Sequence, residues 1–113
     1  MSKVFFPYRS TKFDLSPAEE YGQIRFFLPF PINPFDTDLV VAKLSDAILA
    51  EGFDPEQDYI GMTGQTLIIS LMTGIVFSMC NKVSLLFFDA NVSKYRVRVI
   101  DLATIKGERN GEE

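Results

Sequence analysis

Apolar and polar residues alternate or cluster along the chain in a pattern that predicts five strands separated by helices. The strand-like stretches are rich in Phe, Val, Ile and Leu, and Pro, Gly, Asn or Asp residues bound them. These stretches are Lys3–Tyr8, Gln23–Phe30, Asp58–Met62, Lys82–Asp89 and Lys94–Ile100.

Two helices are predicted in the first half of the chain. Ser16-Pro17-Ala18-Glu19 has the form of a capping box, and Gly22 limits the helix that it opens to about one turn. A longer helix, capped by Asp36 or Thr37, is expected to end at Glu51. Its buried face is predicted from residues at helical spacing, namely Val40, Val41, Leu44, Ala47 and Ile48.

The last two strands differ in their patterns. Lys82–Asp89 is apolar on both faces, which predicts a position at the centre of the sheet with Phe87 in the core. Lys94–Ile100 alternates between apolar and basic residues, which predicts a half-exposed strand pairing antiparallel with Lys82–Asp89. Its cations, which include Arg98, are interpreted as a solvated strand face that guards against edge-to-edge association.

The order of these elements predicts an α/β fold. Strands joined through helices tend to run parallel. We therefore expect a small mixed, mainly parallel sheet with helices packed on it and a C-terminal antiparallel hairpin. Residues 1–103 are predicted to form a single domain, and residues 104–113 a flexible polar tail.

A third helix, Leu67–Cys80, carries an unusual mixture of residues. At 14 residues it reaches about 21 Å, short of the roughly 30 Å of a bilayer core, so no membrane association and a cytoplasmic location are expected. Its large side chains are apolar nearly all round, which favours cover by a second subunit and hence a homo-oligomer through this helix. A stripe of small residues follows one side and offers an alternative, close packing on the sheet: Thr66, Ser70, Thr73, Gly74 and Ser78.

Composition excludes several function classes. The net charge of −4 argues against a protein that binds duplex nucleic acid. The chain has one cysteine, Cys80, and no histidine, which removes Cys-His catalysis, the Ser-His-Asp triad and zinc fingers. No metal or other cofactor is predicted; Asp54, Glu56 and Asp58 are interpreted as a solvated loop, because their spacing is not that of an EF-hand.

Ligands of such sheets bind beyond the carboxyl ends of the strands, where four segments are candidates. These are residues 9–12, 29–33, 63–66 and 89–91. In the first segment, Arg9 and Lys12 supply positive charge and Ser10 and Thr11 supply donors, an inventory that suits an anionic or nucleotide ligand. The alternative is an ordinary solvated loop.

The segment Thr63-Gly64-Gln65-Thr66 precedes the third helix. A turn at this place offers backbone N–H groups and the positive end of a helix dipole to a phosphate or carboxylate. It is not a P-loop, because the flanking Gly spacing and the Lys-Ser/Thr pair are absent. The alternative is a structural hinge in which Gln65 or Thr66 caps the helix.

Three longer stretches resemble a family of small phage proteins. They are "RSTKFDLSPAEEYG", "INPFDTDLVVAKLSDAI" and "DYIGMTGQTLIISLMTGIVFSMCNKVSLLFFDANVSKYRVRVI". The resemblance covers roughly Val4 to Ile100. Where the family tends to have His, this chain has Lys12 or Phe13, so no role of that His is carried over. The order of strand, small-residue turn and helix is also loosely similar to that of small CRISPR-associated proteins that bind or cleave cyclic oligoadenylates.

These resemblances imply a phage anti-defence protein that sequesters a nucleotide-derived immune signal, such as a cyclic nucleotide or cyclic ADP-ribose, without cleaving it. The ligand-binding residues are then Arg9, Ser10, Thr11 and Lys12 on one side and Thr63, Gly64, Gln65 and Thr66 on the other. One alternative is a ring-nuclease-like enzyme, since Asp, Lys and Tyr remain for acid–base work. Another is a structural or host-protein-binding oligomer.

Overall fold

The computed structural model describes residues 1–105 of the chain, and the predicted tail lies outside them from residue 106 onward. The elements follow the order β1 (Lys3–Tyr8), η1 (Ser16–Glu20), β2 (Gln23–Leu28), α1 (Thr37–Ala50), β3 (Tyr59–Gly61), α2 (Thr66–Met79), β4 (Lys82–Asp89) and β5 (Lys94–Asp101). Residues 102–105 are helical, so the tail predicted from residue 104 begins inside an ordered turn.

The strands form one five-stranded sheet in the order β2-β1-β3-β4-β5. The first four strands are parallel, and β5 pairs antiparallel with β4. The predicted mixed, mainly parallel sheet with a C-terminal hairpin is confirmed. Lys3–Tyr8 is an interior strand that pairs on both sides, and Pro7 is accommodated near its carboxyl end.

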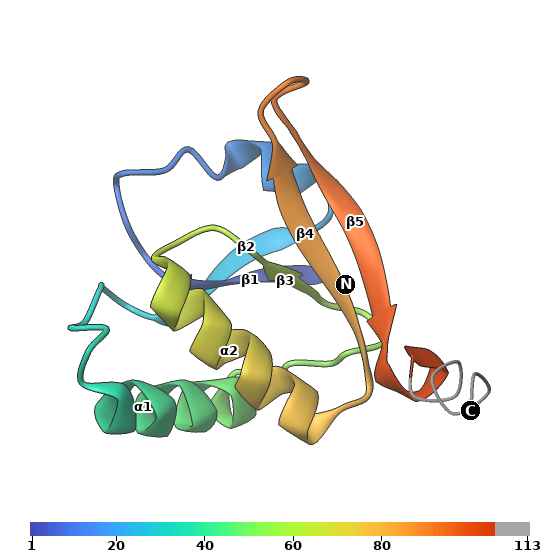
Figure 1. Ribbon diagram of the computed structural model, residues 1–113. Helices are drawn as coiled ribbons and strands as arrows, with labels where there is room; N and C mark the ends of the chain where they lie inside the picture. The colour runs from blue at the N-terminus through green and yellow to red at the C-terminus, as the bar shows by residue number, and fades with distance from the viewer. Residues whose placement is uncertain (106–113) are drawn as a thin grey trace.

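Helices α1 and α2 lie together against one face of the sheet, as Figure 1 shows. This face holds the larger core, in which Phe5 stacks on Phe27 with ring centroids 4.8 Å apart. On the opposite face, η1 covers a smaller core that contains Val4, Phe6 and Leu86. The sheet therefore has a helical layer on one side and only a short helix with its loop on the other.

Helix α1 begins as predicted, because the Asp36 carboxylate accepts a hydrogen bond from the Leu39 N–H. Val40, Leu44 and Ile48 are buried against the sheet. Val41 was predicted on this face but is 39% exposed. The helix contacts the sheet along a narrower stripe than the apolar pattern indicates, because β2 is an edge strand and offers no further surface.

Helix α2 turns its small residues outward. Ile68, Met72 and Val76 are buried, whereas Thr66, Ser70, Gly74 and Ser78 are exposed. Of the large apolar side chains of this helix, only Met79 is strongly exposed. The packing of the small-residue stripe on the sheet is therefore wrong, whereas the homo-oligomer through this helix stays a prediction. No helix among residues 1–105 is long and apolar enough to cross a membrane.

The local structure differs from the sequence prediction at two places. Helix η1 has no side-chain cap of the capping-box type; instead, the Asp14 carboxylate accepts hydrogen bonds from the N–H and hydroxyl of Ser16. Asp58 was interpreted as part of a solvated loop but is only 3% exposed. Its carboxylate accepts the N–H of Lys3 at 3.0 Å and that of Asp54 at 2.9 Å, and so joins the starts of β1 and β3.

Strand β4 is interior but not central, and its last residues run beyond β3. Gly61, the last residue of β3, pairs with Leu86, so Phe87 and the residues after it are paired only with β5. Phe87 is 41% exposed, and its predicted place in the core is wrong. The apolar side chains of β4 thus become exposed to solvent beyond the point where the neighbouring strand β3 ends.

Gly61 leaves room for a buried aromatic ring. A Cβ built on it would meet ring atoms of Phe6 at 2.3–2.6 Å, whereas a Cβ on Gly74 would meet nothing within 4 Å. We expect Gly61→Ala to lower the free energy of unfolding by about 1–3 kcal/mol, because the core has to shift. Gly74→Ala, on the exposed face of α2, should raise it by up to about 1 kcal/mol. Chemical denaturation measures both, and equal effects would contradict the close packing at Gly61.

Candidate functional site

A cleft lies at the carboxyl ends of β1 and β3, where the predicted binding segments 9–12 and 63–66 meet. It has a volume of about 290 Å³. Ser10 and Lys12 line one side, and Gly64 and Gln65 line the other. Chain segments more than 50 residues apart thus converge on one hollow, because β1 and β3 are parallel neighbours and end at the same edge of the sheet.

Backbone geometry shapes the side of the cleft formed by residues 64 and 65. The Tyr8 phenol oxygen accepts the N–H of Gln65 at 2.7 Å, which ties the turn to the end of β1. The Gln65 side chain caps α2 by accepting the N–H of Ile68 at 3.0 Å. Gly64 has a φ of +152°, and a Cβ there would stand 3.0 Å from Pro7. The turn is therefore a structural hinge with a Gln65 cap, and it also forms a wall of the cleft.

The loop after β1 supplies the charge. The Ser10 hydroxyl accepts the N–H of Lys12 at 3.2 Å, which closes a small turn and sets the direction of the loop. Lys12 is exposed and lines both the cleft and an adjoining hollow of about 410 Å³. Phe13, 40% exposed, also lines both. One ammonium group and one aromatic face are thus available to a ligand in either space.

Four of the eight predicted binding residues do not line this cleft. The Arg9 guanidinium lies 4.5 Å from the centre of the Phe26 ring, and Arg9 lines a different hollow with Arg25. The Thr63 hydroxyl is hydrogen-bonded to the Tyr95 phenol at 2.8 Å in the adjoining hollow. Thr11 and Thr66 are exposed, and neither lines the cleft.

The eight predicted binding residues do not include the apolar walls of the cleft. These walls are Tyr8, Phe13, Pro31, Ile32, Pro34 and Ile68. Pro31 and Ile32 belong to a candidate segment at the same edge, residues 29–33, so the sheet-edge rule located that wall. The fourth candidate segment, residues 89–91, is carried away from the cleft at the tip of the β4–β5 hairpin.

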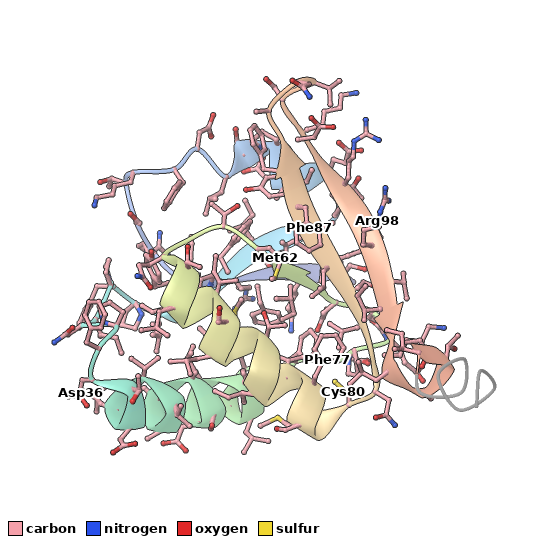
Figure 2. All side chains as sticks on the ribbon, in the orientation of Figure 1. Asp36, Met62, Phe77, Cys80, Phe87 and Arg98 are labelled. Carbon is pink, nitrogen blue, oxygen red and sulfur yellow. The ribbon has the colours of Figure 1, made fainter. Side chains whose placement is uncertain are left out.

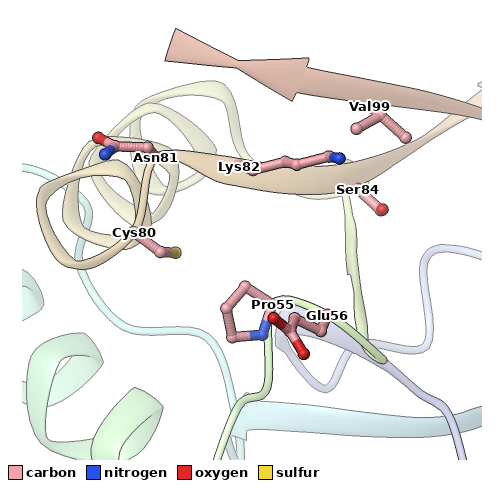
Figure 3. Close-up of a pocket in the computed structure, with 7 residues that line it drawn as sticks. All are labelled: Pro55, Glu56, Cys80, Asn81, Lys82, Ser84 and Val99. Atoms are coloured by element: carbon pink, nitrogen blue, oxygen red, sulfur yellow. The ribbon is translucent and has the colours of Figure 1, made fainter. Parts of the chain in front are cut away.

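A larger hollow, of about 570 Å³, lies at the opposite end of the strands (Figure 3). Pro55 and Glu56 form one side of it, and Cys80, Lys82 and Ser84 form the other. The Cys80 thiol donates a hydrogen bond to the Val76 carbonyl, and burial raises its pKa, so the reactive thiolate form is disfavoured. This hollow lies at the amino ends of the strands, away from the edge that usually binds ligands in α/β sheets.

Two ionisable groups near the cleft, Asp14 and Tyr95, have shifted pKa values. Hydrogen bonds from Ser16 lower the pKa of Asp14, which keeps this exposed carboxylate charged. Burial raises the pKa of Tyr95, an effect that the hydrogen bond between its phenol and the Thr63 hydroxyl partly opposes. Within residues 1–105, no group of three or more His, Cys, Asp or Glu side chains is arranged to hold a metal ion. The cleft thus presents hydrogen-bond donors, one cation and apolar walls.

The fold and the cleft define a small α/β protein whose candidate binding site lies at the carboxyl edge of a mixed sheet. Residues 3–102 match the family described as Phage Pam3 gp32-like protein, and the chain belongs to this family of phage proteins. The match covers the ordered domain from the start of β1 to the end of β5. No curated protein and no solved structure matches the chain.

Proposed function

We propose that this phage protein binds a small anionic, nucleotide-type ligand in the cleft between residues 10–13 and 64–65 and acts by sequestering it. The observation that carries the proposal is the convergence of Ser10 and Lys12 with Gly64 and Gln65 at the carboxyl edge of the sheet. An immune signal such as a cyclic nucleotide or cyclic ADP-ribose has the matching chemistry, because it combines phosphate with a stackable base.

Each part of such a ligand has a counterpart in the cleft. The Lys12 ammonium suits a phosphate. Residues 66 and 67 begin α2, and no acceptor among the described residues takes their N–H groups, so the positive end of the helix dipole adds to this side. The exposed ring of Phe13 offers a face on which a base can stack.

Sequestration is favoured over cleavage by the groups that line the cleft. Its ionisable side chains are Lys12 and Tyr8, and the Tyr8 oxygen already accepts the N–H of Gln65. Among residues 1–105, no carboxylate lines the cleft to serve as a general base beside them. Incubation with a cyclic oligoadenylate, followed by denaturation and chromatography, should return the ligand intact; a linear product would support the ring-nuclease alternative instead.

We expect Lys12→Ala to weaken ligand binding about 10- to 150-fold, because a hydrogen bond to a charged phosphate contributes about 1.5–3 kcal/mol. Calorimetry with a panel of cyclic nucleotides and cyclic ADP-ribose isomers measures the change. Stability should hardly change, since Lys12 is exposed.

The matched control is Lys82→Ala, which removes the same charge from the hollow at the other end of the strands. It should leave the affinity within about threefold, or roughly 0.6 kcal/mol. Loss of binding in Lys82→Ala but not in Lys12→Ala would move the site to that hollow. Failure of the parent protein to bind any member of the panel would favour a protein-binding role.

A further inference from the structure

The β4–β5 hairpin projects from the domain as an arm, here defined as residues 87–96. Beyond Leu86 the two strands pair only with each other, since β3 has ended. Figure 1 shows the arm at one end of the molecule and α1 at the opposite end. The arm exposes three large apolar side chains, Phe87, Phe88 and Val92, each by 41–49%. These side chains lie outside both hydrophobic cores and do not line the ligand cleft, and of the three only Phe88 lines the adjoining hollow described above.

One face of the arm combines an aromatic side chain with positive charge. Phe87 lies directly opposite Arg96, and Arg98 follows two residues later on the same face at the base of the arm. Figure 2 shows Phe87 on β4 and Arg98 on the neighbouring β5. Arg96 is paired with Asp89 at 2.7 Å, whereas Arg98 has no carboxylate partner within residues 1–105. Counting Lys94, the arm and its base carry three cations against one carboxylate.

The other end of the molecule carries a complementary hollow between α1 and the end of β2. Its volume is about 390 Å³, within the size range of ligand pockets and large enough for a phenyl ring. Phe27, Phe30 and Ile32 contribute its apolar wall. Asp46 and Glu51 line it with one cation, Lys43, so its lining has a net negative charge. Phe30 is 62% exposed, so the apolar surface continues beyond the hollow.

We propose that the arm of one copy docks into the α1–β2 hollow of a second copy, with Phe87 as the anchor and Arg98 facing Asp46 or Glu51. The two surfaces have opposite charge and matching apolar character, and an aromatic anchor in a pocket with charged groups around it is the usual form of a binding hot spot. Because the two surfaces are different and lie at opposite ends of the molecule, the contact is head-to-tail and builds a ring or an open chain of subunits.

A symmetric pairing of two β5 edges is the simplest competing arrangement, and its charges oppose it. Such a pair would be antiparallel, and a register centred on residue 97 would place Arg96 of one copy opposite Arg98 of the other. Like charges across strands are destabilising, and cations on an edge strand commonly prevent this association. The arm therefore requires a partner surface of opposite charge, which this chain itself provides.

Sedimentation velocity over a concentration series tests the proposal. We expect the parent protein to sediment as a species heavier than the monomer, whose mass is 12.8 kDa. The association should weaken as the salt concentration is raised. Phe87→Ala should weaken association about 30-fold, the effect of removing a 2 kcal/mol hot spot. The matched control is Phe88→Ala, which removes the same side chain at similar exposure from the opposite face of the arm and should change association less than threefold.

Mixing two damaged proteins distinguishes a head-to-tail contact from a symmetric one. Arg98→Glu damages only the arm, and Glu51→Arg damages only the hollow, so each variant alone should stay monomeric. An equimolar mixture should form a one-to-one complex through the two intact surfaces. A parent protein that remains monomeric at every concentration, or an assembly that survives both Phe87→Ala and Arg98→Glu, would overturn the proposal. Ligand calorimetry on Phe87→Ala tests the cleft separately from the assembly. Because Phe87 does not line the cleft, this variant should bind the ligand as well as the parent protein does, whatever its assembly state.

Discussion

Phe6→Ala is expected to lower the free energy of unfolding by about 3–5 kcal/mol. Phe6 is completely buried on the face of the sheet covered by η1, where its ring packs beside Phe26 and Tyr95. It also fills the space above Gly61, which has no side chain of its own. Alanine would leave a cavity that a thin layer on this face cannot fill. Since domains of this size have about 5–15 kcal/mol of stability in total, the variant should melt much lower or fail to fold.

The control for this prediction is Phe87→Ala. Phe87 lies in a segment that is equally apolar in sequence, but 41% of its surface is exposed on the arm. Its replacement should cost less than about 1 kcal/mol, because little apolar area is returned to water. Chemical denaturation of both variants measures the difference. Equal losses would mean that β3 extends further along β4 than Gly61.

Asp58→Ala should lower the free energy of unfolding by about 2–4 kcal/mol, because two backbone N–H groups lose their acceptor. The two carboxylate oxygens accept from different partners, Oδ1 from Lys3 and Oδ2 from Asp54. The side chain is nearly buried, so water does not readily replace it. The N-terminal end of β1 should therefore detach from the start of β3.

Hydrogen exchange at the Lys3 and Asp54 amides provides a local readout of this contact. Both amides should exchange faster in Asp58→Ala than in the parent protein. Glu56→Ala removes an exposed carboxylate from the same loop and should change stability by less than about 0.5 kcal/mol. If the Lys3 amide keeps its protection in Asp58→Ala, the carboxylate does not hold the two strands together.

The candidate site was only partly predictable. The rule that ligands bind at the carboxyl ends of parallel strands located three segments that do meet, residues 9–12, 29–33 and 63–66. It failed for residues 89–91, because the sequence pattern does not tell how far β4 runs beyond its three-residue neighbour β3. The rule also does not predict which side chains of a segment point into the cleft. Arg9 and Lys12 look equivalent in the sequence, yet Arg9 stacks on Phe26 and Lys12 lines the cleft.

The sequence by itself determined the local structure and its order along the chain. Apolar periodicity, the Asp36 cap and the glycines set the strands and helices within a few residues, because these signals act between neighbours in the chain. The order of elements then led to a mainly parallel sheet, since short helical connections allow few other topologies.

Only the tertiary structure decided which apolar surfaces are covered. Burial depends on the lengths and positions of elements that are distant in sequence, and no local pattern encodes them. The end of β3 at Gly61 exposes Phe87, the packing of α2 turns its small residues outward, and the meeting of β1 with β3 buries Asp58. For the same reason, the shapes of the cleft, the arm and the α1–β2 hollow follow only from the tertiary structure.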